Sequence, residues 1–149
     1  MDLANVQKLK TYDECYTYLN QDFKNEVTHA RNTIAKAKTY STHTGKKLGI
    51  TFETTTYYDE NGNSLFEKCV TNKKSVIYSM TSTDGKQLYF KDFDGDGNID
   101  FLTKNDCYGE NYWAVKDRDS NGEFDIGFVA DGQRFGVYGL RLNINFKYY

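Results

Sequence analysis

A regular recurrence of turn signals constrains the fold of this 149-residue chain more than any other feature. From residue 48 onward, segments rich in Ile, Val, Thr, Tyr and Phe are separated by short polar turns about 11 to 13 residues apart. The turn signals are Asn61-Gly62, Asn72-Lys73, Asp84-Gly85, Asp96-Gly97, Cys107-Tyr108-Gly109, Asn121-Gly122 and Asp131-Gly132. This spacing predicts an antiparallel meander of about eight or nine strands. Its expected strands include residues 49–58, 75–80, 86–93, 98–104, 112–117, 124–130 and 142–149.

The first 40 residues follow a helical period instead. Residues spaced three or four apart share one stripe of a helix, namely Tyr16, Leu19, Phe23, Val27, Ala30, Ile34 and Ala37. Thr11 and Glu14 have the spacing of a capping box, so this long helix is predicted over about 12–39. A shorter helical segment with Leu3, Val6 and Leu9 is expected before it.

We therefore expect one α+β domain over residues 1–149, in which a long N-terminal helix packs on the meander. Residues 1–47 form the helical segment and, at 40–47, a linker, while residues 48–149 form the meander. Closure of the meander into a barrel is left open. Aromatic residues make up 16% of the chain, which supplies enough large apolar side chains for a core.

Charge and targeting signals narrow the range of partners and locations. Residues 1–49 carry eight Lys or Arg against five Asp or Glu, and residues 50–149 carry eleven against sixteen. Neither part has a dense basic surface, so nucleic acid is not a favoured partner. Because no signal peptide or membrane span is recognisable, the expected location is the cytoplasm of the producing or host cell, with export by another route left open. The cysteines, Cys15, Cys69 and Cys107, fit no disulfide framework and are expected to be reduced.

Two of the turns carry a repeated acidic pattern. Residues 92–100, DFDGDGNID, and residues 117–125, DRDSNGEFD, share the form D-x-D-x-[DN]-G-x-x-D. Side-chain oxygens at positions 1, 3, 5 and 9 and a backbone carbonyl at position 7 can surround one cation, and glycine at position 6 permits the sharp turn. The candidate metal ligands are Asp92, Asp94, Asp96, Asn98 and Asp100 in the first loop and Asp117, Asp119, Asn121, Glu123 and Asp125 in the second.

Over these nine residues, each loop resembles the DxDxDG calcium-binding loops of EF-hands, dockerins and integrin-like propeller repeats. The resemblance implies Ca²⁺, and the all-oxygen donor set favours Ca²⁺ over Zn²⁺ or Mg²⁺. Thr103 and Phe128 occupy position 12, where an EF-hand has a bidentate Glu. Since the flanking segments predict strands, the pattern favours a calcium loop between strands. A third turn keeps only Asp59, Asn61 and Gly62 of the pattern and is expected to be a turn alone.

The meander also predicts where the two acidic loops lie. Successive hairpin turns alternate between the two ends of a sheet, so both loops are expected at the same end, about 10 Å apart at about 4.8 Å per strand.

The alternative to metal binding is a purely structural role for the acidic loops, because Asp, Asn and Gly are common turn residues. Against that role, two carboxylates about 5 Å apart repel by roughly 3 kcal/mol at an effective dielectric constant near 20. A bound cation would relieve this repulsion.

From these features we expect a non-catalytic binding or inhibitory protein whose acidic β-loops bind calcium and which acts by contact with a protein partner. Its Asn, Lys and Tyr content would suit a phage or mobile-element protein that acts on a host protein. The alternative is a small metal-dependent hydrolase that uses one acidic loop. His29 and His43 belong to no catalytic motif, so no catalytic residue is assigned.

Overall fold

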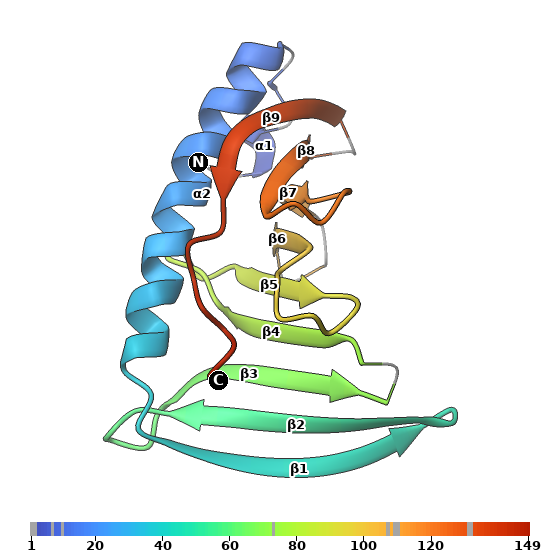
Figure 1. Ribbon diagram of the computed structural model, residues 1–149. Helices are drawn as coiled ribbons and strands as arrows, with labels where there is room; N and C mark the ends of the chain where they lie inside the picture. The colour runs from blue at the N-terminus through green and yellow to red at the C-terminus, as the bar shows by residue number, and fades with distance from the viewer. Residues whose placement is uncertain are drawn as a thin grey trace.

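The computed structural model describes residues 3–6, 8–9, 11–72, 74–106, 108, 111–130 and 133–149. Figure 1 shows its helices and strands. In chain order they are α1 (Leu3–Val6), α2 (Tyr12–Ala35), β1 (Thr39–Lys47), β2 (Ile50–Tyr58), β3 (Ser64–Thr71), β4 (Val76–Thr81), β5 (Gln87–Asp92), β6 (Phe101–Asn105), β7 (Asn111–Lys116), β8 (Glu123–Val129) and β9 (Gln133–Arg141). Within the described ranges, no helix is both long and apolar enough to cross a membrane.

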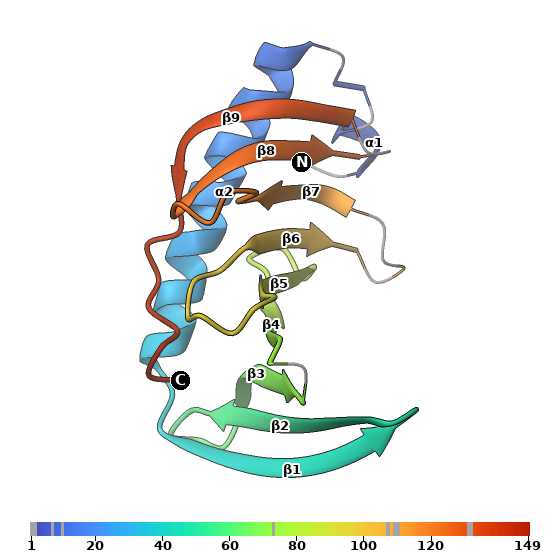
Figure 2. The same cartoon turned by 45° about the vertical axis from the view of Figure 1, so that its right-hand side comes forward.

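The nine strands form one antiparallel sheet in the order β1 to β9, with α2 packed against it. The predicted α+β meander is therefore confirmed. The sheet is open and not a closed barrel, since β1 and β9 are its two edges (Figure 2).

Cys15 and Cys69 are free thiols. Several residues named in the sequence analysis lie outside the described residues, namely Lys73, Cys107, Gly109, Asp131 and Gly132.

The long helix α2 begins with the predicted capping box. Thr11 Oγ1 accepts a hydrogen bond from the Glu14 backbone N–H at 3.2 Å, and Glu14 Oε2 accepts one from the Thr11 N–H at 3.4 Å. The buried members of the predicted stripe are Leu19, Phe23, Val27, Ala30 and Ile34. The helix ends at Ala35 and not near residue 39, because Lys38 N–H donates to the Tyr58 carbonyl at 2.8 Å and so already joins the chain to β2.

Alternate residues of the central strands fill the face of the sheet beneath α2. Two rows of paired residues cross this face, Met80–Leu88–Lys104–Trp113–Val129 and Tyr78–Phe90–Leu102–Val115. All of these side chains are buried. Each large apolar member stabilises the fold by about 1.5–3 kcal/mol relative to an exposed side chain. One member of the first row is a lysine.

Residues 40–47, predicted to be a linker, belong to the edge strand β1. This strand pairs with β2 over nine consecutive residues without a register shift. Its threonines favour an extended backbone, but its side chains are almost all exposed. Because no face of β1 is covered, it lacks the apolar alternation by which a strand is recognised in a sequence. The turn from β1 to β2, at Leu48 and Gly49, is also absent from the turn signals of the sequence. These residues have φ values of 52° and 79°, as a type I′ hairpin turn requires.

Residues 142–149, predicted to be the last strand, form no strand. The chain leaves β9 after Arg141 and runs back over the same side of the sheet as α2 (Figure 1). Phe146 is buried there, with its ring 4.1 Å from that of Tyr78 and 5.0 Å from that of Phe90. The Tyr78 hydroxyl donates to the Phe146 carbonyl at 2.9 Å. The polar–apolar alternation of this segment resembles a strand, but burial of Phe146 over β4 and β5 determines its path.

Lys104 is buried between the sheet and the helix, where it lies among acidic groups. Its Nζ is 2.9 Å from Asp22, 3.1 Å from Glu26 and 3.3 Å from Asp84. Asp22 also accepts a hydrogen bond from Trp113 Nε1 at 2.7 Å. Burial disfavours the charge of the lysine, but its contacts with Asp22 and Glu26 outweigh this effect, so the pKa of Lys104 is raised. A buried ion cluster thus joins α2 to β6 within an apolar core.

Replacing Lys104 by methionine leaves the buried Glu26 and the partly buried Asp22 without their counter-ion. Removal of one partner of a buried ion pair typically costs about 3–5 kcal/mol. We therefore expect Lys104→Met to lower the free energy of unfolding by about that amount, as measured by urea titration at pH 7. The matched control is Arg141→Met, which breaks an exposed ion pair with Glu123 and is expected to cost less than about 1 kcal/mol. Equal losses in the two variants would contradict a structural role for the buried cluster.

Candidate metal site

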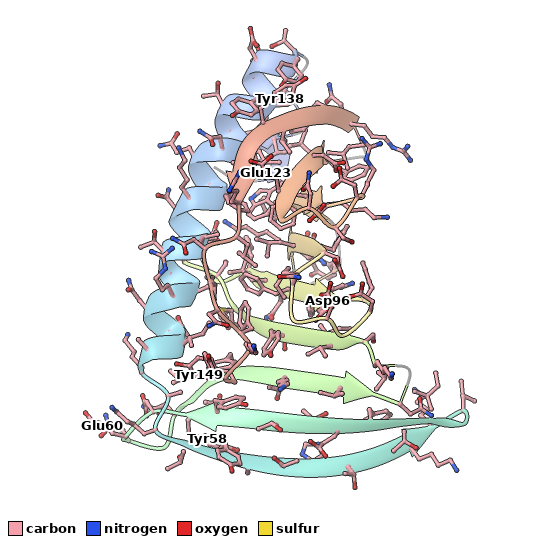
Figure 3. All side chains as sticks on the ribbon, in the orientation of Figure 1. Tyr58, Glu60, Asp96, Glu123, Tyr138 and Tyr149 are labelled. Atoms are coloured by element: carbon pink, nitrogen blue, oxygen red, sulfur yellow. The ribbon has the colours of Figure 1, made fainter. Side chains whose placement is uncertain are left out.

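The two acidic loops lie at the same end of the sheet, as the meander predicts. The first connects β5 to β6 and the second connects β7 to β8. Asp117 N–H, at the start of the second loop, donates to the carbonyl of Asp100, at the end of the first, at 2.9 Å. Asp96 and Glu123 mark the two loops in Figure 3. The loops therefore adjoin through their backbones.

Four carboxylates of the first loop converge on one point. Asp92, Asp94, Asp96 and Asp100 each offer one oxygen, and these four oxygens lie within 4.8 Å of one another. Two oxygens bound to one Ca²⁺ at 2.3–2.6 Å are separated by at most about 4.6–5.2 Å, which is twice that distance. The four oxygens are therefore close enough together to hold a single metal ion.

Glycines and backbone amides give the first loop its shape. Asp92 accepts hydrogen bonds from Gly95 N–H at 2.9 Å and from Gly97 N–H at 2.8 Å. Both glycines have left-handed backbones, with φ values of 72° and 92°. A Cβ atom on Gly95 would lie 2.5 Å from the carbonyl oxygen of Lys74, so the close approach of these two segments requires glycine.

The other carboxylates of the cluster also accept backbone hydrogen bonds. Asp94 accepts one from Asp96 N–H at 3.3 Å, Asp96 from Asn98 N–H at 2.8 Å, and Asp100 from Phe93 N–H at 2.9 Å. Such bonds are usual in Asp-rich turns. Each ionised carboxylate has about four lone-pair sites, so these amide contacts are compatible with simultaneous binding of a cation.

Crowding of the carboxyl groups shifts their proton affinities. Burial, with a contribution from contact with Asp94, raises the pKa of Asp92. The hydrogen bond from Asp92 lowers the pKa of Asp94. Burial likewise raises the pKa of Asp100, and the negative charges of Asp94, Asp96 and Asp117 add to the effect. A cation at the centre of the cluster would lower the pKa values of Asp92 and Asp100 and favour the ionised carboxylates.

The second loop neutralises its acids with arginines. Asp125 pairs with Arg118 at 3.3 Å, and Glu123 pairs with Arg141 on the neighbouring strand β9. Within the described part of the chain, the acids of the second loop do not converge as those of the first loop do. One candidate ligand, the Asp125 carboxylate, therefore already has a cationic partner, whereas Glu123 is a candidate only through its backbone carbonyl.

The remaining side chains of the second loop form a turn. Asp117 accepts hydrogen bonds from Gly122 N–H at 2.9 Å and from Asn121 N–H at 3.3 Å. Asp119 accepts one from Asn121 Nδ2 at 3.3 Å. Calcium binding by this loop stays a prediction.

The third Asp-Asn-Gly sequence connects β2 to β3 as a turn. Asp59 Oδ1 accepts hydrogen bonds from the N–H groups of Asn61 and Asn63, both at 2.9 Å. These contacts, led by the Asn63 amide, lower the pKa of Asp59. Its carboxylate therefore has a structural role, which makes this turn a useful comparison for the first acidic loop.

A cavity of about 500 Å³ adjoins the first acidic loop. Its lining includes Lys68, Tyr78, Asp92, Asp96, Asn145, Phe146 and Lys147. The cavity therefore lies between the loop, β3 and β4, and the C-terminal segment, with two lysines and two carboxylates of the cluster on its walls. Lys68 Nζ also donates to the Tyr149 carbonyl at 2.6 Å.

Sequence reasoning missed the buried cluster around Lys104, although a signal was present. Asp22 and Glu26 stand four residues apart, next to Phe23 and Val27 of the predicted stripe, so they lie near the face of the helix that packs on the sheet. Lys104 follows the buried Leu102 by two residues, and alternate strand residues share a face. The three charges could therefore have been assigned to the helix–sheet interface.

Comparisons with known proteins add little to this geometry. Neither a known protein family nor a curated protein sequence matches the chain. A structure of an S. aureus TarM mutant in complex with Fondaparinux, α-GlcNAc-glycerol and UDP is 13% identical, with a TM-score of 0.34, over 91% of this chain and 26% of that one. A second TarM structure is 14% identical, with a TM-score of 0.31, over 90% and 25%. The chain thus spans about a quarter of TarM, and a likeness at these TM-scores carries no functional information.

The raised pKa of Asp100 leads to a prediction with a definite sign. The folded protein holds this proton more tightly than the unfolded chain does, so ionisation of Asp100 as the pH rises above about 4 destabilises the cation-free fold. We therefore expect Asp100→Asn to raise the Tm in EDTA at pH 7. The gain should shrink as the pH falls toward the ordinary pKa of Asp, about 4, because wild-type Asp100 takes up its proton as the pH falls. Asparagine is the chosen replacement because its side-chain oxygen can still accept the hydrogen bond from Phe93 N–H.

The matched control is Asp125→Asn, at the same position of the second loop. Asp125 pairs with Arg118, so this substitution removes a favourable contact and is expected to lower the Tm slightly at pH 7. Differential scanning calorimetry of both variants from pH 4 to pH 7 makes the comparison. A loss of stability in Asp100→Asn at pH 7 in EDTA would contradict the repulsion inferred for the first loop.

Proposed function

We propose that this protein is a non-catalytic binding protein whose β5–β6 loop holds one Ca²⁺ ion, and that the ion fixes a surface that contacts another protein. The observation that carries the proposal is the convergence of four carboxylate oxygens within 4.8 Å of one another in a loop of nine residues. The carbonyl oxygen of Asn98, at position 7 of the loop, is the expected additional ligand.

The chemistry of the donors supports calcium. Every proposed ligand is an oxygen, and hard oxygen donors suit Ca²⁺ better than Zn²⁺, which favours nitrogen and sulfur. Burial raises the pKa values of Asp92 and Asp100, and neighbouring carboxylates add to the effect, so the ionised cluster has a need for positive charge. A divalent cation would stabilise the ionised form of the whole cluster.

Phe93 supports a role in protein contact. It lies between two proposed ligands, Asp92 and Asp94, and half of its surface is exposed. Its N–H donates to Asp100 at 2.9 Å, and its ring lies 6.2 Å from that of Phe101. Binding of an ion would hold the backbone on both sides of Phe93 and keep this aromatic side chain in one position. Rigidly held aromatic side chains are frequent anchors of protein interfaces.

A metal-dependent hydrolase is the second candidate, which the cavity beside the loop favours. Lys68 and Lys147 line this cavity together with Asp92 and Asp96, so an anionic substrate would have both a cation site and lysines nearby. Turnover of phosphate esters and glycosides in Ca²⁺ distinguishes the two candidates. Turnover that Asp92→Ala abolishes in a folded protein would favour the hydrolase, whereas we expect the wild-type protein to show none.

Calcium is expected to raise the Tm, and EDTA is expected to reverse the change. An ion that binds only the folded protein stabilises it by about 2.7 kcal/mol at a hundredfold excess over the Kd. Isothermal titration should give one Ca²⁺ per chain. The double substitution Asp92→Ala with Asp94→Ala should abolish both the heat of binding and the Tm shift, because it removes two of the four converging carboxylates.

Two further variants serve as controls for the calcium effect. Asp59→Ala removes a carboxylate that caps a turn outside the proposed site, so it should lower the Tm equally in Ca²⁺ and in EDTA. Asp100→Asn should melt above wild type in EDTA but below it in excess Ca²⁺, because the same substitution relieves repulsion and removes a ligand. Melting curves that respond to neither Ca²⁺ nor EDTA would remove the calcium proposal.

The contact role of Phe93 is tested separately from ion binding. Phe93→Ser should leave the Ca²⁺-induced Tm shift unchanged, since the side chain of Phe93 is not a proposed ligand. Affinity capture from the native or host cell should recover a protein with wild type in Ca²⁺, and less of it with Phe93→Ser or in EDTA. Equal recovery under all three conditions would place the contact surface elsewhere.

A further inference from the structure

The outer side of β1 offers a long, regular strand edge. β1 is paired on one side only, with β2, over nine consecutive residues. In both ribbon views it is the outermost element at its end of the molecule (Figures 1 and 2). An edge strand of this kind is a template for pairing with another strand, because its outward N–H and C=O groups have no partner in the sheet.

The turn between β1 and β2 determines which residues present these groups. Leu48 and Gly49 form a two-residue turn, in which the Lys47 carbonyl accepts the Ile50 N–H. Backbone groups alternate in direction along an antiparallel strand. The odd-numbered residues of β1 therefore bond to β2, while the even-numbered residues direct their N–H and C=O groups outward, namely Tyr40, Thr42, Thr44 and Lys46.

A second copy of β1 fits this edge in one full-length register. Antiparallel pairing over all nine residues requires a two-fold axis at His43, the middle residue of Thr39–Lys47. Tyr40 then faces Lys46 of the other copy and Thr42 faces Thr44, which makes about eight hydrogen bonds between the chains. The two His43 residues face each other as a pair without mutual hydrogen bonds, with Cα atoms about 4.5 Å apart.

The side chains suit this register. Lysines on an edge strand normally oppose pairing through charge repulsion. Here Lys46 faces Tyr40 of the other copy, an aromatic ring that can receive a cation, and Lys47 faces Thr39. No two charged side chains of β1 are opposed. Any shift of the register shortens the overlap and removes hydrogen bonds.

We propose that two copies of this protein associate through β1 about a two-fold axis at His43, so that their sheets join into one continuous sheet. A second copy is the proposed occupant because, in this register, each Lys46 faces Tyr40 and no charged side chain faces another. The pairing does not depend on the proposed calcium site, because the acidic loops follow β5 and β7, whereas the pairing uses β1 alone.

Proline at position 44 tests the use of this edge. The Thr44 N–H points outward, so Thr44→Pro removes hydrogen bonds between chains but none between β1 and β2. By sedimentation velocity between about 10 μM and 1 mM, wild type should shift from monomer toward dimer, which is the weak association expected for a small interface. Thr44→Pro should remain a monomer with an unchanged circular dichroism spectrum. A wild-type protein that stays monomeric up to 1 mM would overturn the proposal.

Cysteine cross-linking tests the register and does not require proline to be tolerated. In the proposed dimer two cysteines at position 43 face each other within disulfide range, whereas a cysteine at position 44 faces Thr42. Under oxidation His43→Cys should form a disulfide-linked dimer at least about tenfold faster than either Thr44→Cys or wild type. Wild type measures the background cross-linking by the native cysteines. Equal rates would overturn the register. Cross-linking that persists in EDTA separates this proposal from the calcium proposal, since each can fail without the other.

Discussion

The contact between Lys104 and the two helical carboxylates, Asp22 and Glu26, is the interaction on which the arrangement of this protein depends. The lysine stands in the middle of a row of buried side chains that crosses the sheet, where an unpaired charge would be strongly destabilising. Asp22 and Glu26 of α2 pair with it, together with Asp84 of the β4–β5 turn. The same contact fixes how α2 lies across the strands, and those strands carry the acidic loops at their ends. The buried ion cluster thus holds the helix on the sheet whose hairpin turns include both acidic loops.

The two acidic loops show two solutions to the same electrostatic problem. Each gathers several acids into nine residues. In the second loop arginines pair with Asp125 and Glu123, and one of these arginines comes from β9. In the first loop the carboxylates face one another, with a raised pKa at Asp92 and at Asp100. Natural proteins tend to retain such local conflicts at functional sites. The contrast between neighbouring loops of similar sequence is the reason to place the proposed ion in the first.

Much of the fold follows from local patterns. The capping box at Thr11 and the turn spacing predict the start of α2 and the meander, and the meander places both loops at one end. The sequence-based predictions of secondary structure fail where tertiary contacts determine the path of the chain. β1 is polar because nothing covers it, and the segment after Arg141 leaves the sheet because Phe146 is buried over β4 and β5. The sequence motif is shared by both loops, so it does not reveal which carboxylates converge. That difference is seen only in the folded chain, where Asp125 pairs with Arg118 and the four acids of the first loop converge.

Diffraction from crystals grown in CaCl₂ tests the central claim most directly, because it locates the ion as well as detecting it. We expect an anomalous peak in the β5–β6 loop, with oxygens of Asp92, Asp94, Asp96 and Asp100 at about 2.3–2.6 Å from it. Carboxylates that remain in place around ordered water in saturating calcium, with no anomalous peak among them, would contradict the account.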